Sequence, residues 1–273
     1  MSDDTPVPIG FRRIAAREKA GWVRRQFDAI APRYDRMNTL LSFGIHHLWK
    51  RRAMAWLDPR PGERILDLCG GTGDLAVAAV RRTGPHGRVT LCDINREMIR
   101  VGRAASRHAA ERAALDYVEG DAERLPFRDR SFDGVVVGFG IRNLTRMDRG
   151  FAEILRILRP GGRLVVLEFS HPADPLFRRI YDLYSFSLMP RLGRRLAGSA
   201  EAYAYLAESI REFPDAGTLA GRLRNAGFSE VRYDRLTRGV AALHAGRRPD
   251  PHPDRHPDRP QTPGTREPKG PRK

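Results

Sequence analysis

The chain has 273 residues, of which 41% are hydrophobic, and it carries a formal net charge of +16. This length suits one large α/β domain or two small ones, and no apolar run reaches the roughly 18 residues of a membrane-spanning helix. The polar first residues (1–8) lack the apolar segment of a secretory signal, and Cys69 and Cys92 each end an apolar strand candidate as buried thiols. We therefore expect a reducing, cytoplasmic location.

The excess of positive charge has two interpretations. A basic surface attracts nucleic acid or anionic lipid headgroups. An arginine-rich composition can equally reflect a GC-rich genome. The charge alone does not decide between them.

The N-terminal part of the chain precedes the first predicted strand. Residues 1–20 have a mixed composition, and we expect them to be mobile. Over residues 21–58 apolar residues recur at helical spacing, and two breaks, at Ala31-Pro32 and Ser42-Phe43-Gly44, divide the segment into short helices. Because the segment is rich in aromatic residues, we expect a helical lid over a binding site, with simple packing as the alternative.

The stretch from Arg64 to Leu75 reads R-I-L-D-L-C-G-G-T-G-D-L and organises the rest of the chain. A short apolar strand ending at Cys69 precedes a glycine turn, and a helical pattern opens at Asp74. A strand, a glycine turn and a helix in this order form a nucleotide pocket in α/β sheets, at the carboxyl end of the strand.

Two kinds of ligand fit this turn. The spacing Gly71-x-Gly73-x-x-Ala76 satisfies the dinucleotide fingerprint, in which a pyrophosphate binds at the helix N-terminus. However, Asp67 and Asp74 would repel a pyrophosphate, and their charges suit a ligand with a cationic end. S-adenosylmethionine (SAM) has an ammonium and a sulfonium there and no phosphate. We therefore favour SAM over NAD, and a glycine turn that binds nothing is the third interpretation.

The next two strands end in acidic residues. Asp93 ends the predicted strand 88–93, about 20 residues after Gly73, where an acid accepts hydrogen bonds from ribose hydroxyls in NAD and SAM sites alike. Asp121 follows a third strand around residues 115–118, where an adenine would be bound. A turn aspartate that binds nothing is the alternative for Asp121.

A fourth predicted strand, 134–138, is followed by Arg142 and Asn143. These two residues lie beside the expected crevice, and they suit a substrate site better than a structural role. A helix over 147–158 and a fifth, strongly apolar strand over 163–169 come next.

The C-terminal third contains a second unusual segment, residues 176–200, which mixes aromatic and aliphatic residues with arginines. This mixture fits a greasy substrate or a bilayer surface, with packing on the sheet as the alternative. Residues 228–236 and 239–244 are predicted to close the sheet as an antiparallel pair. Residues 247–273 are rich in proline and arginine and cannot bury a core, so we expect a disordered tail. No metal-ligand spacing is found.

Several motifs together resemble known proteins. Four patterns resemble class I SAM-dependent methyltransferases: D-L-x-G-G-T-G-D at 67–74, the acid Asp93, D-A-E-x-L-P-F at 121–127 and L-R-P-G-G at 158–162. Four longer ones look like the quinone C-methyltransferases: Y-D-x-M-N at 34–38, S-F-G-I-H-x-L-W-K-R at 42–51, F-G-I-R-N at 139–143 and Y-L-x-E-S-I at 205–210. The resemblance covers residues 10–246.

This resemblance implies a Rossmann-like α/β fold, with a mostly parallel seven-stranded sheet, an antiparallel last strand and helices on both faces. The methyltransferase domain would span residues 21–246. Together with the glycine turn, the resemblance gives a set of SAM-binding residues: Asp67, Gly71, Thr72, Gly73, Asp93, Asp121, Ala122 and Gly138. Gly138 stands where the family often has serine, so a side-chain contact is lost there.

The function that the resemblance implies is methyl transfer from SAM to a ring carbon of a polyprenyl quinol. The product would be menaquinol, made from demethylmenaquinol, or a benzoquinol of ubiquinone synthesis. An aromatic carbon is a poor nucleophile, so the enzyme should stabilise a phenolate. We predict that Arg142 does so, that Asn143 orients the ring, and that segments 21–58 and 176–200 house the prenyl tail.

Other properties follow as expectations. We expect peripheral contact with the inner membrane surface, a homodimer and no nucleic-acid partner. Two alternatives remain: an RNA methyltransferase, which would use the net charge, and an NAD-dependent oxidoreductase.

Overall fold

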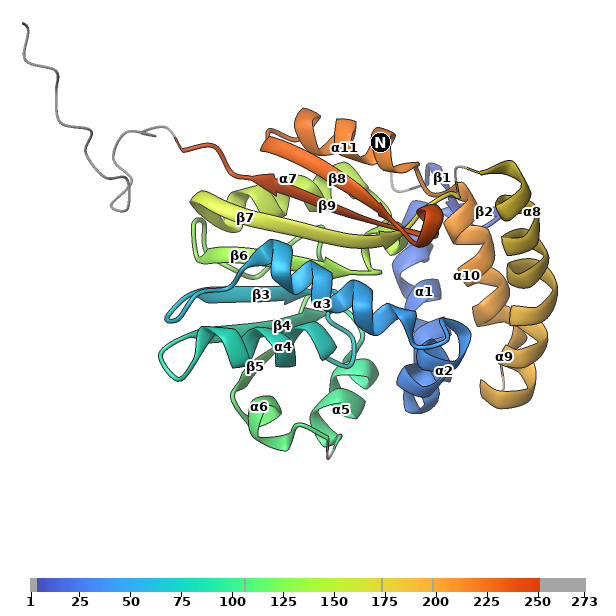
Figure 1. Cartoon of the computed structure of the whole chain (residues 1–273), viewed down its shortest axis with the longest axis horizontal. Coiled ribbons are helices and arrows are strands. Elements are labelled where there is room, and N and C mark those ends of the chain that lie inside the picture. Colours follow the sequence, from blue (N-terminus) through green and yellow to red (C-terminus); the bar gives the residue numbers. More distant parts are fainter. Residues whose placement is uncertain (1–3, 106, 173, 198, 251–273) are drawn as a thin grey trace, which may run out of the picture.

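A computed structural model describes residues 4–105, 107–172, 174–197 and 199–250 of the chain. Its centre is a seven-stranded sheet (Figure 1). The strands, in spatial order, are β5 (Leu115–Glu119), β4 (Arg88–Asp93), β3 (Arg64–Leu68), β6 (Phe132–Gly138), β7 (Leu158–Phe169), β9 (Ala241–Arg247) and β8 (Ser229–Leu236).

The first five strands of this order are parallel, and β9 runs antiparallel to both β7 and β8. The expected mostly parallel sheet with an antiparallel closing strand is therefore confirmed. Parallel strands need covered faces, and β3 shows how its sequence meets this need. Ile65 packs into the core on one face and Leu66 into the core on the other, and both are fully buried.

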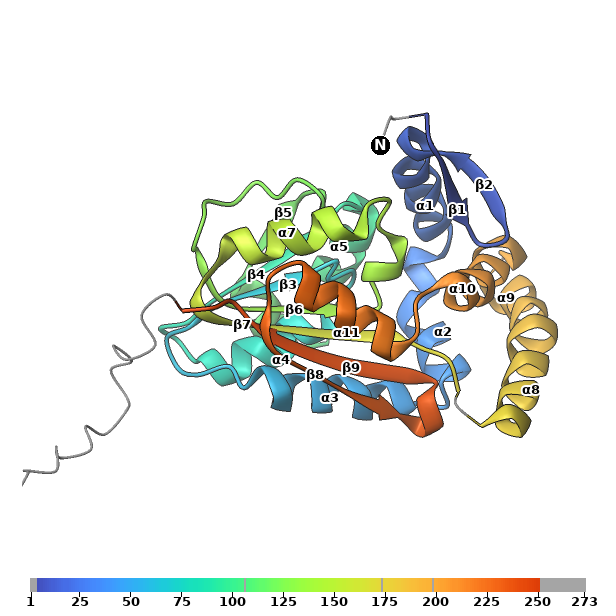
Figure 2. The same cartoon turned by 90° about the horizontal axis from the view of Figure 1, so that it is seen from above.

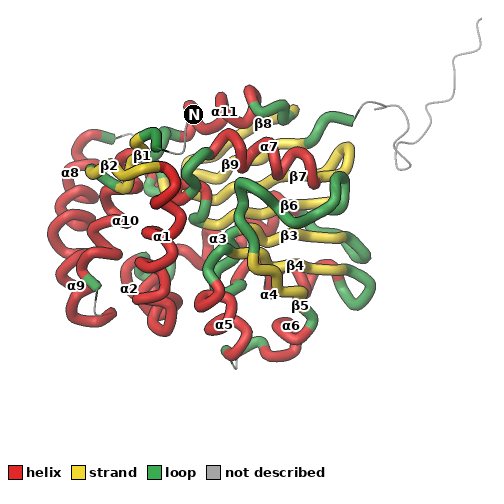
Figure 3. Tube along the Cα trace, turned by 180° about the vertical axis from the view of Figure 1, so that it is seen from behind, coloured by secondary structure: helices red, strands yellow, loops and turns green. Residues whose placement is uncertain are grey.

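Helices cover both faces of the sheet. On one face lie α3 (Ile45–Leu57) and α4 (Asp74–Thr83), and on the other α7 (Met147–Ile157) and α11 (Ala216–Asn225) (Figure 3). The remaining helices near β4 and β5 are α5 (Arg96–Ala104) and α6 (Ala109–Ala113). Helix α3 was expected to be part of the lid. Instead it packs on one face of the sheet, where Trp49 and Leu57 belong to the hydrophobic core.

A separate group of helices, here called the cap, lies beyond the carboxyl ends of the parallel strands (Figure 2). The cap combines helices from two segments that are far apart in the chain. These segments were predicted from the sequence as two separate features. It consists of α1 (Ala16–Ile30), η1 (Ala31–Arg33), α2 (Tyr34–Leu41), α8 (Pro175–Leu183), the π-helical η3 (Tyr184–Leu188), α9 (Met189–Ala197) and α10 (Ala200–Glu212). Two small apolar clusters join all of these elements except η1 and α8, one around Met37, Met189 and Tyr203 and one around Val23 and Tyr205. Helix α8 packs through Phe177 and Tyr181 against the core of the sheet.

The N-terminal residues form regular structure that the sequence pattern did not predict. Strands β1 (Pro6–Ile9) and β2 (Arg12–Ala15) pair as an antiparallel hairpin, which packs on the cap. The backbone N–H of Phe11 donates to Glu208 of α10 at 3.1 Å. The expected mobility of residues 1–20 stays a prediction, but from Pro6 onward the segment has defined contacts.

The end of the described chain is also attached. Arg247 ends β9, and the guanidinium of Arg248 donates to the carbonyls of Leu155, Arg156 and Leu158. The first residues of the expected disordered tail are therefore held on the sheet, whereas residues 251–273 lie outside the described residues. Two short 3-10 helices complete the fold: η2 (Ile141–Asn143) and η4 (Thr237–Gly239). Within the described chain, no helix is both long enough and apolar enough to span a bilayer.

Candidate active site

Two cavities meet at the carboxyl edge of the sheet, beneath the cap. The larger cavity, of about 1240 Å³ including its open mouth, lies between the cap and the glycine turn after β3. The smaller cavity, of about 760 Å³, lies over the ends of β4 and β5. Six residues line both: Phe27, Tyr34, Cys69, Gly71, Gly138 and Phe139. One ligand can therefore extend from the smaller cavity into the larger one.

The glycine turn brings the backbone close to both cavities. Gly73 begins α4 with a φ of 88°, a conformation that favours glycine, and a Cβ there would lie 2.8 Å from Leu91 Cδ1. The backbone N–H of Gly71 donates to the Asp93 carboxylate at 2.8 Å, and that of Asn95 donates to its other oxygen at the same distance. The turn and the end of β4 thus fix each other.

The residues expected to bind the cofactor divide between the cavities. Asp93, Asp121 and Ala122 line the smaller cavity, where Asp121 also accepts a hydrogen bond from the Glu123 N–H. Asp67 and Thr72 line the larger cavity, and Gly71 and Gly138 line both. Gly73 lines neither cavity and acts through the shape of the turn.

Asp67 is a buried acid with unused hydrogen-bonding capacity. One carboxylate oxygen accepts from the Ala76 N–H at 2.8 Å, and the other, Oδ1, is buried and has no hydrogen-bond partner among the described residues. Burial raises the pKa of Asp67 to about 7. A cationic group in the larger cavity would supply the missing partner and favour the ionised form.

Asp74 does not play the part that the sequence suggested. Its carboxylate forms an ion pair with Lys50 of α3 at 2.7 Å, and the lysine keeps the pKa of Asp74 below its ordinary value even though burial opposes this. The expectation of two free carboxylates at the mouth of the pocket was therefore wrong. Among the described residues that line the larger cavity, Asp67 is then the one carboxylate without an ion-pair partner.

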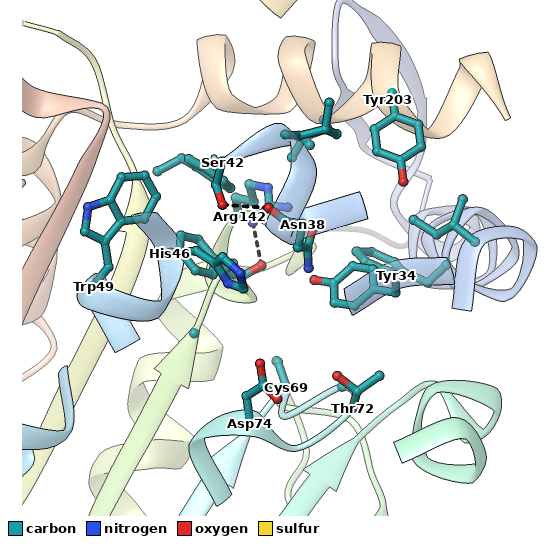
Figure 4. A pocket seen from close by; sticks show the side chains of 18 of the residues that line it. Tyr34, Asn38, Ser42, His46, Trp49, Cys69, Thr72, Asp74, Arg142 and Tyr203 are labelled. Atoms are coloured by element: carbon teal, nitrogen blue, oxygen red, sulfur yellow. Dashed lines mark hydrogen bonds between the residues drawn. The ribbon is translucent and has the colours of Figure 1, made fainter. Parts of the chain in front are cut away.

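Arg142 lies at the larger cavity (Figure 4). Its buried guanidinium pairs with Glu168 of β7 at 2.8 Å. The same guanidinium donates to the Phe139 carbonyl and lies over the Phe169 ring, whereas its Nε has no partner among the described residues. Burial alone would lower the pKa of Arg142, but the charge of Glu168 raises it. Arg142 is therefore a fixed cation with one donor left for a ligand.

Asn143 lies on the other side of the same 3-10 helix. It lines the smaller cavity, and its Oδ1 accepts a hydrogen bond from the Tyr205 hydroxyl at 3.0 Å. Tyr205 itself lines the larger cavity. Any effect of Asn143 on a ligand in the larger cavity is thus transmitted through Tyr205, and the direct ring contact that we expected has no support in this geometry.

The cap and the first turn of α3 supply site residues that the sequence pattern did not single out. Figure 4 shows Tyr34, Asn38 and His46 facing Cys69 and Thr72 across the larger cavity. Burial, followed by the charge of Lys50, lowers the pKa of His46 to about 4, so this imidazole is neutral near pH 7. Tyr34, Asn38 and His46 lie within the motifs at 34–38 and 42–51. These motifs therefore pointed to the site, although no single residue in them was predicted to line it.

Several hydrogen bonds tie the cap to the loops of the sheet, and two of them join side chains of α1 and α2 to these loops. The Thr72 hydroxyl donates to Asp35 of α2 at 2.6 Å, and the Asn95 amide donates to Asp28 of α1 at 2.9 Å. Helices α1 and α2 therefore cover the region between the two cavities.

The strand order and the glycine turn define the class I SAM-dependent methyltransferase fold. Two solved structures share it: a SAM-dependent methyltransferase from Thermotoga maritima (TM-score 0.59, 19% identity, 83% of this chain and 99% of that chain) and the [4+2]-cyclase SpnF (TM-score 0.61, 17% identity, 84% and 95%). At these identities the likeness concerns the fold alone.

The chain belongs to the ubiE/COQ5 methyltransferase family, whose model matches residues 14–248. It is similar to the ubiquinone/menaquinone biosynthesis C-methyltransferases UbiE of Ruegeria sp. (45% identity, 89% of this chain and 97% of the relative) and of Edwardsiella ictaluri (46%, 90% and 99%). The chain is thus a SAM-dependent C-methyltransferase, and the oxidoreductase alternative is not supported.

The residues present fit SAM. The carboxylates of Asp93 and Asp121 line the cavity where the ribose and the adenine would lie, and each carboxylate is oriented by backbone N–H groups. The unpartnered Oδ1 of Asp67 suits the ammonium of the methionine part. The assignment of SAM as the cofactor therefore rests on these three carboxylates, of which Asp67 has an oxygen without a hydrogen-bond partner among the described residues, as well as on the family.

Proposed function

We propose that the chain methylates a ring carbon of a polyprenyl quinol, converting demethylmenaquinol to menaquinol, and that a benzoquinol of ubiquinone synthesis is a second candidate substrate. The observation that carries the proposal is the character of the larger cavity. Its wall is mostly aromatic and aliphatic, and it includes the buried guanidinium of Arg142, whose Nε has no hydrogen-bond partner among the described residues.

When bound, SAM supplies an electrophilic methyl group on its sulfonium. The chain's own residues then have two tasks. Asp93, Asp121 and Asp67 would hold the adenosine and the ammonium of the cofactor. The six residues that line both cavities surround the opening between them, through which a ring carbon in the larger cavity would approach the methyl donor.

Arg142 is proposed to stabilise the phenolate that makes the ring carbon nucleophilic. Its guanidinium is held by Glu168 and the Phe139 carbonyl, so it does not reorganise when a charge develops on the substrate oxygen. Glu168 is proposed as a positioning residue. The neutral His46 is a poor acceptor for the phenol proton because its pKa is about 4.

The long apolar part of the substrate is assigned to the cap. The side chains of Leu41, Tyr181, Tyr184, Met189 and Leu206 line the cavity between the glycine turn and the outer helices. An apolar lining without charges suits an isoprenoid chain, and this is the role expected of segments 21–58 and 176–200. The UbiE relatives are named for both ubiquinone and menaquinone biosynthesis, so the choice of ring needs an experiment.

The experiment is a direct assay with the purified chain. It would be incubated with methyl-labelled SAM and, separately, with reduced demethylmenaquinone and reduced 2-polyprenyl-6-methoxy-1,4-benzoquinone, and the products would be identified by mass spectrometry. We expect label on a ring carbon of the naphthoquinol. Label on the benzoquinol alone would replace the substrate, and label on neither would overturn the proposal.

We further propose that the enzyme works on the cytoplasmic side of the inner membrane, where a polyprenyl substrate resides, and that it binds no nucleic acid. A homodimer stays a prediction. Sedimentation of the purified chain would measure its oligomeric state.

A further inference from the structure

The outer face of α8 presents large aliphatic side chains to solvent. Leu176, Ile180 and Leu183 are 69%, 60% and 68% exposed, and their i, i+4, i+7 spacing places them on one side of the helix. The helix has no buried residue at all. A surface helix that turns such a face outward has left its apolar side uncovered.

The same region includes an exposed aromatic residue from another part of the chain. Phe43, in the turn between α2 and α3, is 80% exposed and adopts a φ of 50°. Its ring lies 6.2 Å from that of Tyr184, which lines the larger cavity and donates a hydrogen bond to the Leu41 carbonyl. We call Phe43, Leu176, Ile180 and Leu183 the outer apolar patch; it adjoins the cavity wall.

The surroundings of the outer apolar patch are strongly basic. Helices α8 and α9 carry exposed arginines on their solvent side: Arg178, Arg179, Arg191, Arg194 and Arg195. Over residues 175–197 the sequence has a single acid, Asp182, and it is paired with Arg211 of α10. Apolar side chains flanked by arginines match the chemistry of an anionic lipid surface, in which acyl chains lie beneath phosphates.

We propose that the outer apolar patch and the arginines of α8 and α9 dock the enzyme on an anionic phospholipid bilayer, with the wall of the larger cavity held against the membrane. Tyr181 of α8 lines the cavity while Ile180, its neighbour, faces outward. The bilayer would therefore lie one helix away from the substrate site. The proposal rests on the proposed function, because it gives a prenylated substrate a short path from the membrane into the cavity.

The test uses the full chain and vesicles of phosphatidylcholine, with or without phosphatidylglycerol at roughly one lipid in three. Binding would be measured by co-sedimentation. The first variant is Leu176→Ser/Ile180→Ser/Leu183→Ser, the second is Arg191→Glu/Arg194→Glu/Arg195→Glu, and none of these residues lines the cavity. The control is Tyr233→Ser, an exposed aromatic residue on the edge strand β8, which belongs to the sheet and lies outside the cap.

We expect the unaltered chain to bind the anionic vesicles and to bind pure phosphatidylcholine weakly. Each triple variant should lose about tenfold or more in affinity for the anionic vesicles, because each removes either three apolar contacts or three attractive charges. The control should bind like the unaltered chain. Equal binding by the apolar variant would overturn the proposal.

Activity separates this proposal from the function on which it rests. Both triple variants should methylate a short-chain, water-soluble quinol at the normal rate but lose activity on a long-chain quinol held in vesicles. If the unaltered chain fails on the short-chain quinol, the proposed function fails, and vesicle binding is judged alone. If the apolar variant instead dissociates a dimer while vesicle binding is unchanged, the outer apolar patch is a subunit interface and the docking proposal is wrong.

Discussion

The sheet and the cap contribute opposite kinds of wall to the larger cavity. The sheet side consists of a tight glycine turn and a buried carboxylate, Asp67, backed by strands such as β3 whose apolar residues are fully buried. The cap side consists of aromatic and aliphatic side chains on helices joined by two small clusters, and it leaves several large apolar residues exposed. We call the sheet side the rigid wall and the cap side the loose wall. A rigid wall suits the methyl donor, which is the same in every turnover, and a loose wall suits a long, flexible acceptor.

The largest effect is expected where the two walls meet. Replacing Arg142 by lysine keeps the charge but loses the planar guanidinium that bonds Glu168 and the Phe139 carbonyl and that we propose binds the substrate oxygen. We expect kcat to fall about 100-fold while the dissociation constant of SAM stays within about twofold, because the phenolate loses a fixed donor and the cofactor does not.

Lysine is preferred to alanine in this experiment. Truncation of Arg142 would leave Glu168 buried and unpaired, which costs about 3–5 kcal/mol of stability. Thermal unfolding of the Arg142→Lys variant checks that it is folded. A kcat within threefold of the unaltered enzyme would remove Arg142 from phenolate stabilisation.

Asp67, in the rigid wall, should make the affinity for SAM depend on pH. Burial raises the pKa of Asp67 to about 7, so the carboxyl holds a proton below that pH unless a cation binds beside it. The affinity for SAM should therefore rise with pH, by up to about tenfold per unit, and level off above pH 7. Calorimetry over pH 5–8 measures this trend. In Asp67→Asn the affinity should be weaker, and the part of the trend due to Asp67 should vanish; an unchanged trend would show that another group is responsible.

Linkage gives the same residue a second, opposite signature in the ligand-free protein. The unfolded chain loses this proton near the ordinary pKa of 3.8, whereas the folded chain keeps it until about pH 7. The contribution of Asp67 to stability is thus complete below about pH 4 and is lost as the pH rises to 7. Saturating SAM should restore stability above pH 7.

The smallest effect is expected in the cap. Tyr205→Phe removes the hydroxyl that donates to Asn143 and keeps the ring that lines the larger cavity. We expect the KM for the quinol to rise about two- to fivefold with no change in SAM affinity, because one neutral hydrogen bond is lost. Steady-state kinetics with each substrate varied in turn would measure this. A change confined to SAM binding would mean that Asn143 serves the donor wall instead.

The rigid wall was also the more predictable part of the molecule. An apolar strand, a glycine turn and acids at strand ends are local patterns, so the positions of Asp93 and Asp121 at strand ends follow from the amino-acid sequence. The parallel sheet then brings those strand ends to one edge. Even here the ion pair between Asp74 and Lys50 was not predicted. Lys50 lies on α3, outside the glycine turn, and no local sequence pattern indicates that it neutralises Asp74.

The cap was predicted only as two aromatic segments, because its structure depends on contacts between residues far apart in the chain. Tyr205 reaches Asn143 across 62 positions, and Glu208 reaches Phe11 across 197. The hairpin over β1 and β2 was not predicted because each strand has only 4 residues and β1 contains prolines. Glu168 could have been found: an acid within an otherwise apolar strand needs a buried partner.

The crowding around the glycines at the strand ends has a consequence for protein engineering. A Cβ at Gly138 would lie 2.6 Å from the Leu75 side chain, and one at Gly140 would lie 2.3 Å from the Cys69 Cβ. Neither position accepts even a methyl group without shifting its neighbours. At Gly138 the close atom is the flexible end of Leu75, which can move, whereas at Gly140 it is the fixed Cβ of Cys69. A directed-evolution library that seeks bulkier acceptors should therefore leave Gly140 invariant and vary the helices that face it.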